Sequence, residues 1–177
     1  MEFHWALVAT FGVLLFGTLQ GITVAIVVSL VSLAYQTARP HVYVLGRKRG
    51  TDVLRPLSED HPDDETFPGL LIVRPEGRLF FLNADYVKEQ VIALEAQYHP
   101  HVVVWDMSAV PDIEYSALQA LIEGEKHLGE LGASLWLAGL NPGVLEMVRR
   151  AGFDEKLGSE RMPVSYTHLT LPTSELV

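Results

Sequence analysis

The chain has 177 residues, which is enough for one ordinary domain and an additional segment. Its formal net charge of −9 at pH 7 argues against nucleic acid as a partner. Because the sequence contains no cysteine, it excludes disulfides, thiolate catalysis and zinc sites with sulfur ligands.

Residues 1–38 are predicted to be a transmembrane segment. No charged residue occurs at positions 5–35, a run longer than the roughly 20 residues that cross a bilayer. A secretory signal peptide would have a basic start and a shorter apolar core. Two short helices, at about 5–17 and 20–37, are preferred over one tilted helix, because two glycines and a glutamine interrupt the middle of the run.

Residues 39–67 are predicted to be a cytoplasmic linker. They begin with basic side chains, and positive-inside statistics place that side of the membrane in the cytoplasm. These side chains are also candidates for contact with anionic lipid head groups, although a role as topology signals alone is the simpler interpretation. The membrane-proximal basic residues are Arg39, Arg47, Lys48 and Arg49.

A soluble domain is predicted over residues 68–163. Two strand-like runs, 70–73 and 79–82, are joined by a Pro-Glu-Gly turn, which is typical of a hairpin. Asn83 is predicted to cap a following helix, in which apolar residues recur at spacings of three and four.

The segment 101–131 predicts a strand, a loop and a helix. The apolar run at 102–105 indicates a strand that is covered on both faces. Asp106 ends this strand, and the acidic loop after it is expected at the surface. Ligands of open α/β sheets bind at that carboxyl edge, so the loop is a candidate interaction site.

The remaining elements complete an alternating pattern. Residues 134–138 predict a strand, Asn141 with Pro142 predicts a helix start, and Gly152 predicts the end of that helix. The order strand, strand, helix, strand, helix, strand, helix indicates an α/β fold with a mixed sheet and right-handed crossovers.

Residues 164–177 are predicted to be a non-native tail. The sequence VSYTHLTLPTS at 164–174 has no helical period and no capping pattern, and it matches the translation of a sequencing-library adapter. We therefore expect the native domain to be cut near Met162 or Pro163, before its last helix.

Several motifs together resemble the carboxyl-terminal part of SulP anion transporters. The sequence DMSAVPDIEYSAL at 106–118 is similar to the signature of STAS domains, which these transporters share with anti-sigma factor antagonists. LGRKRGT at 45–51, PGLLIVRPEGRLFFLNA at 68–84 and GSERM at 158–162 occur in the order found in SulP proteins. The resemblance implies a STAS-like α/β domain preceded by a transmembrane helix or helical hairpin.

The resemblance also implies a multi-pass protein of the inner (plasma) membrane with a cytoplasmic STAS domain. In SulP proteins the apolar segment corresponds to the last helices of the transport domain, and the substrate site lies on earlier helices. This chain alone is therefore expected not to transport sulfate or bicarbonate. The implied partners are membrane lipid, the remainder of the transmembrane domain, cytoplasmic regulatory proteins and a second copy in a homodimer.

The loop and helix start at 106–116 are the candidate regulatory site. In anti-sigma factor antagonists a phosphorylated serine precedes a second serine at the start of this helix. Tyr115 and Ser116 stand at these positions, and Ser116 with Gln119 is predicted to cap the helix instead. The candidate site residues are Asp106, Ser108, Asp112, Glu114, Tyr115 and Ser116.

An enzyme is not expected, and neither is a metal or another cofactor. The sequence has no P-loop, no dinucleotide-binding motif, no nucleophile elbow and no His-x-x-x-His pair. The alternative function is a membrane-anchored STAS signalling module of the anti-sigma antagonist type. A conventional acceptor serine and a simple anchor are typical of such a module, and Tyr115 and the double-length apolar run argue against it.

Overall fold

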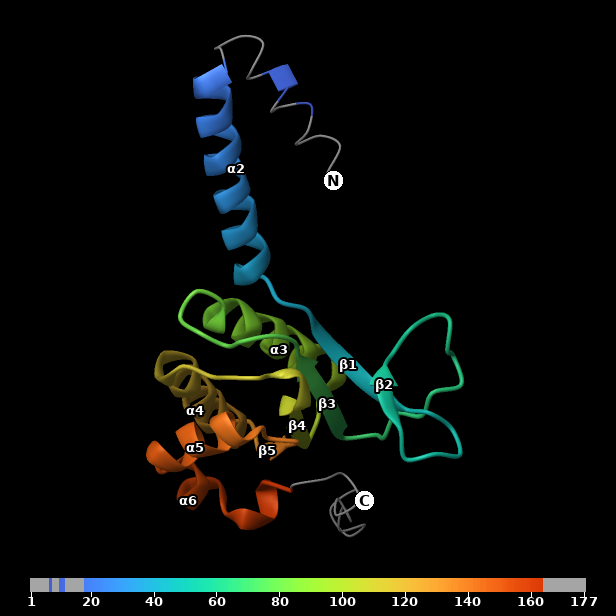
Figure 1. The fold of residues 1–177 in the computed structure, drawn as a ribbon. Helices are drawn as coiled ribbons and strands as arrows, with labels where there is room; N and C mark the ends of the chain where they lie inside the picture. The colour runs from blue at the N-terminus through green and yellow to red at the C-terminus, as the bar shows by residue number, and fades with distance from the viewer. Residues whose placement is uncertain (1–6, 8–9, 12–17, 164–177) are drawn as a thin grey trace. The chain divides into compact units, whose positions relative to one another are not determined.

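The computed structural model describes residues 7, 10–11 and 18–163 (Figure 1). The chain divides into a helical unit that ends at Arg39 and a folded domain that begins at Pro40. Most of the predicted helix at 5–17, and all of the predicted tail at 164–177, lie outside the described residues.

The long helix described in the helical unit is α2, Thr18–Ala38. Within it, Leu19–Ala38 is long and apolar enough to cross a membrane, and only 6% of the most apolar part is buried. Thr23 donates its hydroxyl proton to a carbonyl four residues earlier, which satisfies this polar group without water. α2 covers the predicted helix at 20–37 and includes Gln20 and Gly21, where the run was expected to be interrupted. The choice between two short helices and one tilted helix stays a prediction.

The folded domain is built on a five-stranded mixed sheet in the order β2-β1-β3-β4-β5. Strands β3, β4 and β5 are parallel, and β1 runs antiparallel to both of its neighbours. The strands are β1 Val42–Arg47, β2 Leu54–Pro56, β3 Leu70–Pro75, β4 Val102–Asp106 and β5 Ser134–Ala138.

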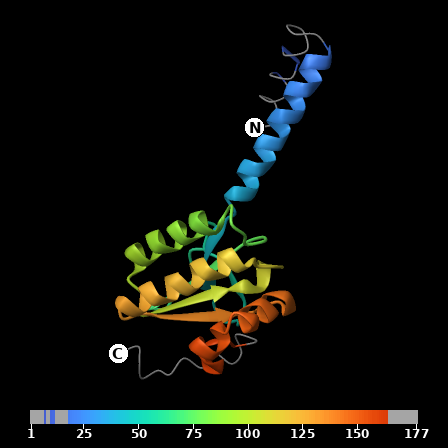
Figure 2. The same cartoon turned by 90° about the vertical axis from the view of Figure 1, so that its left-hand side faces the viewer.

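Each parallel strand is followed by a helix. Figure 2 shows α3 and α4 side by side along the sheet, and they contact each other directly. The helices are α3 Ala84–Tyr98, α4 Tyr115–Glu130, α5 Pro142–Arg150 and α6 Phe153–Leu157, with single 3-10 turns at Met107–Ala109 and Ser159–Arg161.

The main core lies between the sheet and these helices. Alternate strand residues point into it, among them Val73, Val103 and Leu137, each 0% exposed. The other alternate set, which includes Val104, forms a smaller cluster on the opposite face. All five residues of β4 are buried, which confirms that this strand is covered on both faces.

The predicted hairpin is wrong. Residues 79–82 form no strand, and Leu79 makes only an isolated bridge to Ile113. The antiparallel partner of β3 is β1, with Val44 opposite Val73. The Pro-Glu-Gly turn therefore leads from β3 toward α3 and not back along the sheet.

The expected linker contains two strands of the sheet. β1 and β2 both lie within residues 39–67, so the folded domain begins well before Pro68. The segment between β2 and β3 is tied to the sheet as well, since Arg55 of β2 pairs with Asp64 at 2.7 Å. The hydrogen bond from Arg55 lowers the pKa of Asp64.

Two predicted helix caps have different roles in the structure. α4 begins at Tyr115, with Glu114 in the extended N-cap conformation, so the prediction that Ser116 is the cap is wrong. Asn141 and Pro142 begin α5 as predicted. The amide of Asn141 donates to the carbonyl of Val110 at 2.7 Å, so it fastens the loop after β4 to the start of α5.

A fragment of residues 40–163 should fold, and a fragment of residues 68–163 should not. Without β1, the backbone groups along one side of β3 lose their partners, and the exposed strand edge favours aggregation. We expect a single cooperative thermal transition by circular dichroism for the longer fragment only, and aggregates by size-exclusion chromatography for the shorter one. Equal stability of both fragments would contradict the assignment of β1 to the domain.

Candidate functional site

The predicted interaction residues gather at the carboxyl edge of the parallel strands. The end of β4, the turn after it and the amino ends of α3, α4 and α5 all lie at this edge. Ser108, Tyr115 and Ser116 are exposed there, and Asp112 and Glu114 are partly exposed. The structure therefore brings together all of the predicted loop residues, but it does not place them all at the surface.

Asp106 is the exception, because it is 0% exposed. Its carboxylate pairs with Nε of Arg74 on β3 and accepts the backbone N–H of Ser108 at 3.0 Å. Gly139 after β5 passes close by, and a Cβ there would lie 3.2 Å from Oδ1 of Asp106. The expectation that Asp106 lies at the surface is wrong, since Arg74 neutralises it inside the domain.

Arg78 connects the turn after β3 with the loop after β4. Its guanidinium lies 3.0 Å from the carboxylate of Asp112 and 3.0 Å from that of Glu114. Its side chain is 55% exposed, so these pairs add little stability. Backbone hydrogen bonds join the same segments, from Leu79 to the carbonyl of Asp112 and from Glu114 to the carbonyl of Leu79. The loop is thus held by its backbone, and its carboxylates remain accessible.

The basic residues after α2 do not stay together. Arg39 directly follows the helix, but Arg47 lies at the opposite end of β1 from Val42, about 17 Å along the strand. There Arg47 pairs with Glu65 at 2.7 Å. Lys48 and Arg49 are exposed in the turn that follows β1. Their contact with lipid stays a prediction.

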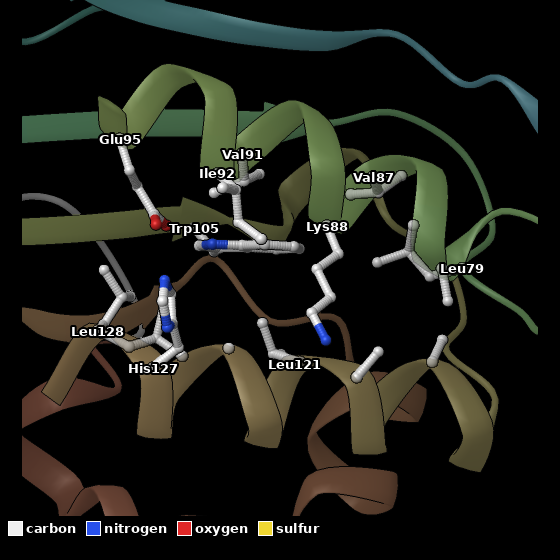
Figure 3. A pocket seen from close by; sticks show the side chains of 15 residues that line it. Leu79, Val87, Lys88, Val91, Ile92, Glu95, Trp105, Leu121, His127 and Leu128 are labelled. Atoms are coloured by element: carbon white, nitrogen blue, oxygen red, sulfur yellow. The ribbon is translucent and has the colours of Figure 1, made fainter. Parts of the chain in front are cut away.

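An apolar pocket lies between α3 and α4, and the sequence analysis did not predict it (Figure 3). The Trp105 ring lies between the two helices. The space that the centre of a water molecule can reach is about 40 Å³, so the pocket is small. Three small residues of α4, Ala117, Ala120 and Gly124, line the pocket and keep the helices from filling it. Helical periodicity predicts such residues as core but gives no measure of the gap between helices.

The polar groups of this pocket are few. Glu95 and Lys88 come from α3 and His127 from α4 (Figure 3). Burial raises the pKa of Glu95, and the charge of nearby His127 opposes that shift more weakly. Lys88 pairs with Glu123 at 3.2 Å, which links the two helices at the rim. The pocket suits a small apolar group, and within the described ranges no cluster of metal ligands accompanies it.

Comparison with known proteins identifies the domain. The model of the STAS domain matches residues 61–169. The chain belongs to the STAS domain family. The match to the STAS family ends inside the segment predicted to be foreign, and the origin of that segment stays a prediction.

Curated relatives of this STAS protein are sulfate transporters. High affinity sulfate transporter 2 from Stylosanthes hamata is 30% identical over 165 residues, which cover 87% of this chain and 25% of that protein. Probable sulfate transporter 4.2 from Arabidopsis thaliana is 30% identical over 167 residues, which cover 88% and 24%. The chain spans about a quarter of the length of these relatives. The predicted resemblance to sulfate transporters is confirmed.

Solved structures support the STAS fold. The structure of SLC26A9 has a TM-score of 0.74 at 20% identity and covers 93% of this chain and 29% of its own. A sulfate transporter family protein from Wolinella succinogenes has a TM-score of 0.52 at 27% identity, and the match covers 63% of this chain and 91% of that protein. An anti-sigma factor antagonist from Mycobacterium paratuberculosis has a TM-score of 0.50 at 19% identity, and the match covers 58% of this chain and 84% of that protein. At this identity the likeness shows a shared fold alone. The predicted STAS-like α/β class is confirmed.

Replacing Arg74 by Met should destabilise the STAS domain far more than replacing Arg78 by Met. R74M leaves the buried carboxylate of Asp106 without its cation, which costs about 3–5 kcal/mol. R78M removes only exposed ion pairs, worth up to about 1 kcal/mol. Urea unfolding of residues 40–163 measures both effects, and similar losses for the two variants would contradict the role assigned to Arg74.

Replacing Glu95 by Gln should stabilise the domain at pH 7.5 but not at pH 4. Because burial raises the pKa of Glu95, its folded form holds a proton more tightly than the unfolded chain. The protonated Glu95 therefore adds to stability below the pKa that it has in the unfolded chain. This contribution is lost as the pH rises through the higher pKa that Glu95 has in the folded domain. Gln does not ionise and avoids this loss. The free energy of unfolding in urea should therefore be higher for E95Q than for the original chain at pH 7.5 and equal to it at pH 4. The exposed Glu89→Gln on the same helix serves as control and should show no such pH dependence.

Proposed function

We propose that this chain is the carboxyl-terminal part of a secondary transporter of sulfate or a similar anion, and that its STAS domain is the cytoplasmic regulatory and interaction module. The observation that carries the proposal is the extent of the similarity to sulfate transporters. It covers 87–88% of the chain, which is more than the STAS match at 61–169 occupies. The similarity therefore includes sequence before the STAS domain, where α2 and β1 lie.

The membrane segment supports a place within a larger transport domain. Among the described residues, one helix is long and apolar enough to cross a membrane. The substrate site of a secondary transporter is formed between repeats that each contain several helices, so a single span cannot supply it. The substrate would therefore bind to the remainder of the transmembrane domain, which is the first partner of this chain.

The charges around α2 support a cytoplasmic STAS domain in a multi-pass protein of the inner membrane. Arg39 directly follows α2, and the positive-inside rule places such a residue on the cytoplasmic side. β1 follows α2 after three residues, so the domain would lie on the same side of the membrane.

The carboxyl edge supports a binding role and not a catalytic one. Asp112, Glu114 and Arg78 offer exposed charges on a loop with a defined backbone, which suits recognition of another protein. Cytoplasmic regulatory proteins and a second STAS domain are the partners that such a surface would take. The signalling alternative has less support, because the anti-sigma factor antagonists share only the fold.

The chain alone should not transport sulfate. We expect proteoliposomes that contain the purified chain to take up no more radiolabelled sulfate than empty vesicles, because alternating access needs two repeats of several helices each, and the described part of the chain offers one span. High affinity sulfate transporter 2, reconstituted in the same way, is the positive control. Uptake by the chain alone would contradict the proposal.

A chimera tests the positive part of the proposal. This chain would replace the matching quarter of High affinity sulfate transporter 2 in cells that lack sulfate uptake. Uptake by the chimera above that of the transporter truncated at the same point would support a role in transport. A chimera that reaches the membrane in normal amounts and takes up no more than the truncated protein would count against it.

A further inference from the structure

The carboxylate of Glu95 faces the pocket between α3 and α4 without an ion pair. Glu95 is half-buried, and within the described part of the chain it makes no hydrogen bond and no salt bridge. Figure 3 shows its carboxylate and the ring of His127 pointing toward one another across the gap between the helices. Burial raises the pKa of Glu95, and the charge of His127 opposes this shift more weakly. The carboxylate has therefore lost water without gaining a full countercharge, so a cation beside it would be favourable.

The surroundings of Glu95 favour a cation as well. Glu95 lies three residues before the end of α3, and His127 lies three residues before the end of α4. The carboxyl end of a helix carries a partial negative charge, and both helices direct this charge to the same end of the pocket. Lys88 lies seven residues before Glu95, about 10 Å along α3, and already pairs with Glu123. A bound cation would thus be attracted to the Glu95 end and repelled from the Lys88 end.

At the Glu95 end the pocket opens into a wider hollow. The hollow has a volume of about 480 Å³, against about 40 Å³ for the pocket. A ligand could enter through the hollow and keep its polar end in contact with water there. Besides Glu95, the ionisable residues that line the hollow are three histidines, whose ring nitrogens accept hydrogen bonds when neutral: His99, His101 and His127.

The dimensions of the pocket favour an alkyl chain over a ring. A buried apolar cavity that binds benzene measures about 150 Å³, so a pocket of about 40 Å³ is too narrow for a ring. Between Glu95 and Lys88 the walls are apolar, formed by Val91, Trp105 and Leu121 among others. An unbranched chain that extends from Glu95 toward Lys88 would contact these side chains along its length.

We propose that this pocket binds a short unbranched primary amine, with the ammonium group against Glu95 and the alkyl chain between α3 and α4 beside Trp105. Such an amine is protonated at neutral pH, as a lysine side chain is, and so supplies the charge and the chain together. The site lies within the folded domain and away from the carboxyl edge. It depends neither on the proposed transport function nor on the position of α2.

Fluorine NMR of the full chain, labelled with 5-fluorotryptophan in non-ionic detergent micelles, tests this site directly. Trp105 lines the pocket, whereas Trp136 packs on the opposite face of the sheet and serves as the internal reference. Loss of one signal in Trp105→Phe, and of another in Trp136→Phe, assigns the spectrum. At pH 7.5 we expect n-butylamine to shift the Trp105 signal saturably, with a dissociation constant on the order of millimolar, and to leave the Trp136 signal in place.

Matched ligands separate the charge from the chain and the chain from the ring. n-Butanol and butanoate have the same number of carbon atoms as n-butylamine but lack its positive charge. Both should bind at least about tenfold more weakly, because neither can form a charge-assisted hydrogen bond to an ionised Glu95. Benzylamine carries the positive charge on a ring and should also bind more weakly, since the pocket is narrow.

Two variants test the residues. Glu95→Gln should weaken the binding of n-butylamine about tenfold, whereas the exposed Glu89→Gln on the same helix should not. Gly124→Leu should abolish binding, because Gly124 lines the pocket and a Cβ there meets nothing within 4 Å, so the new side chain can occupy the space. Gly129→Leu on the same helix is the control, since a Cβ there also meets nothing within 4 Å and Gly129 does not line the pocket. Unchanged circular dichroism confirms that each variant is folded.

Equal affinity of the original chain and E95Q for n-butylamine would overturn the proposal. Tighter binding of butanoate would overturn it as well and would assign the site to an anion at the histidines. Trp105 and Trp136 signals that shift together without saturation would indicate non-specific partition and refute a defined site. None of these measurements involves transport, so their failure would leave the proposed function intact.

Discussion

The carboxyl edge of the sheet depends on one buried ion pair. β4 is covered on both faces, so the carboxylate of Asp106 at its end must be neutralised within the protein. Arg74 on β3 does this, and the N–H of Ser108 fills a further acceptor position. The pair fixes the ends of β3 and β4 relative to each other and sets the course of the loop after β4. Asn141 then joins this loop to α5. The positions of the exposed residues at this edge therefore depend on the carboxylate of Asp106, which is buried and cannot contact a partner itself.

Sequence patterns predicted those elements that carry a local signal, such as a helical period, a continuous apolar run or a capping residue. The helical spacing of α3 and α4, the apolar run of β4 and the Asn-Pro start of α5 all correspond to the structure. β1 was missed because its six residues are followed by a basic run that resembles a membrane-flanking linker, and strand pairing between distant segments leaves no local signal. The buried state of Asp106 was missed for the same reason, since Arg74 lies 32 residues earlier.

The pocket between α3 and α4 shows a second limit of sequence patterns. Trp105 was correctly placed in a covered strand, but the gap beside it depends on the distance between two helices. The size of the gap depends on the small residues of α4 that line it, and a helical pattern of apolar residues does not predict how much space small residues leave. The fold itself occurs in transporters and in anti-sigma factor antagonists, so the fold alone does not determine the function.

The antiparallel insertion of β1 has a mechanical consequence. β1 is continuous with α2 through three residues, one of them Pro40 with its restricted backbone, so the connection has little slack. A pull on the end of α2 would load β1 along its length, and its hydrogen bonds to β2 and β3 would bear that load together in shear. A strand loaded in shear on both sides gives way only when many of its hydrogen bonds break together, so β1 would resist such a pull.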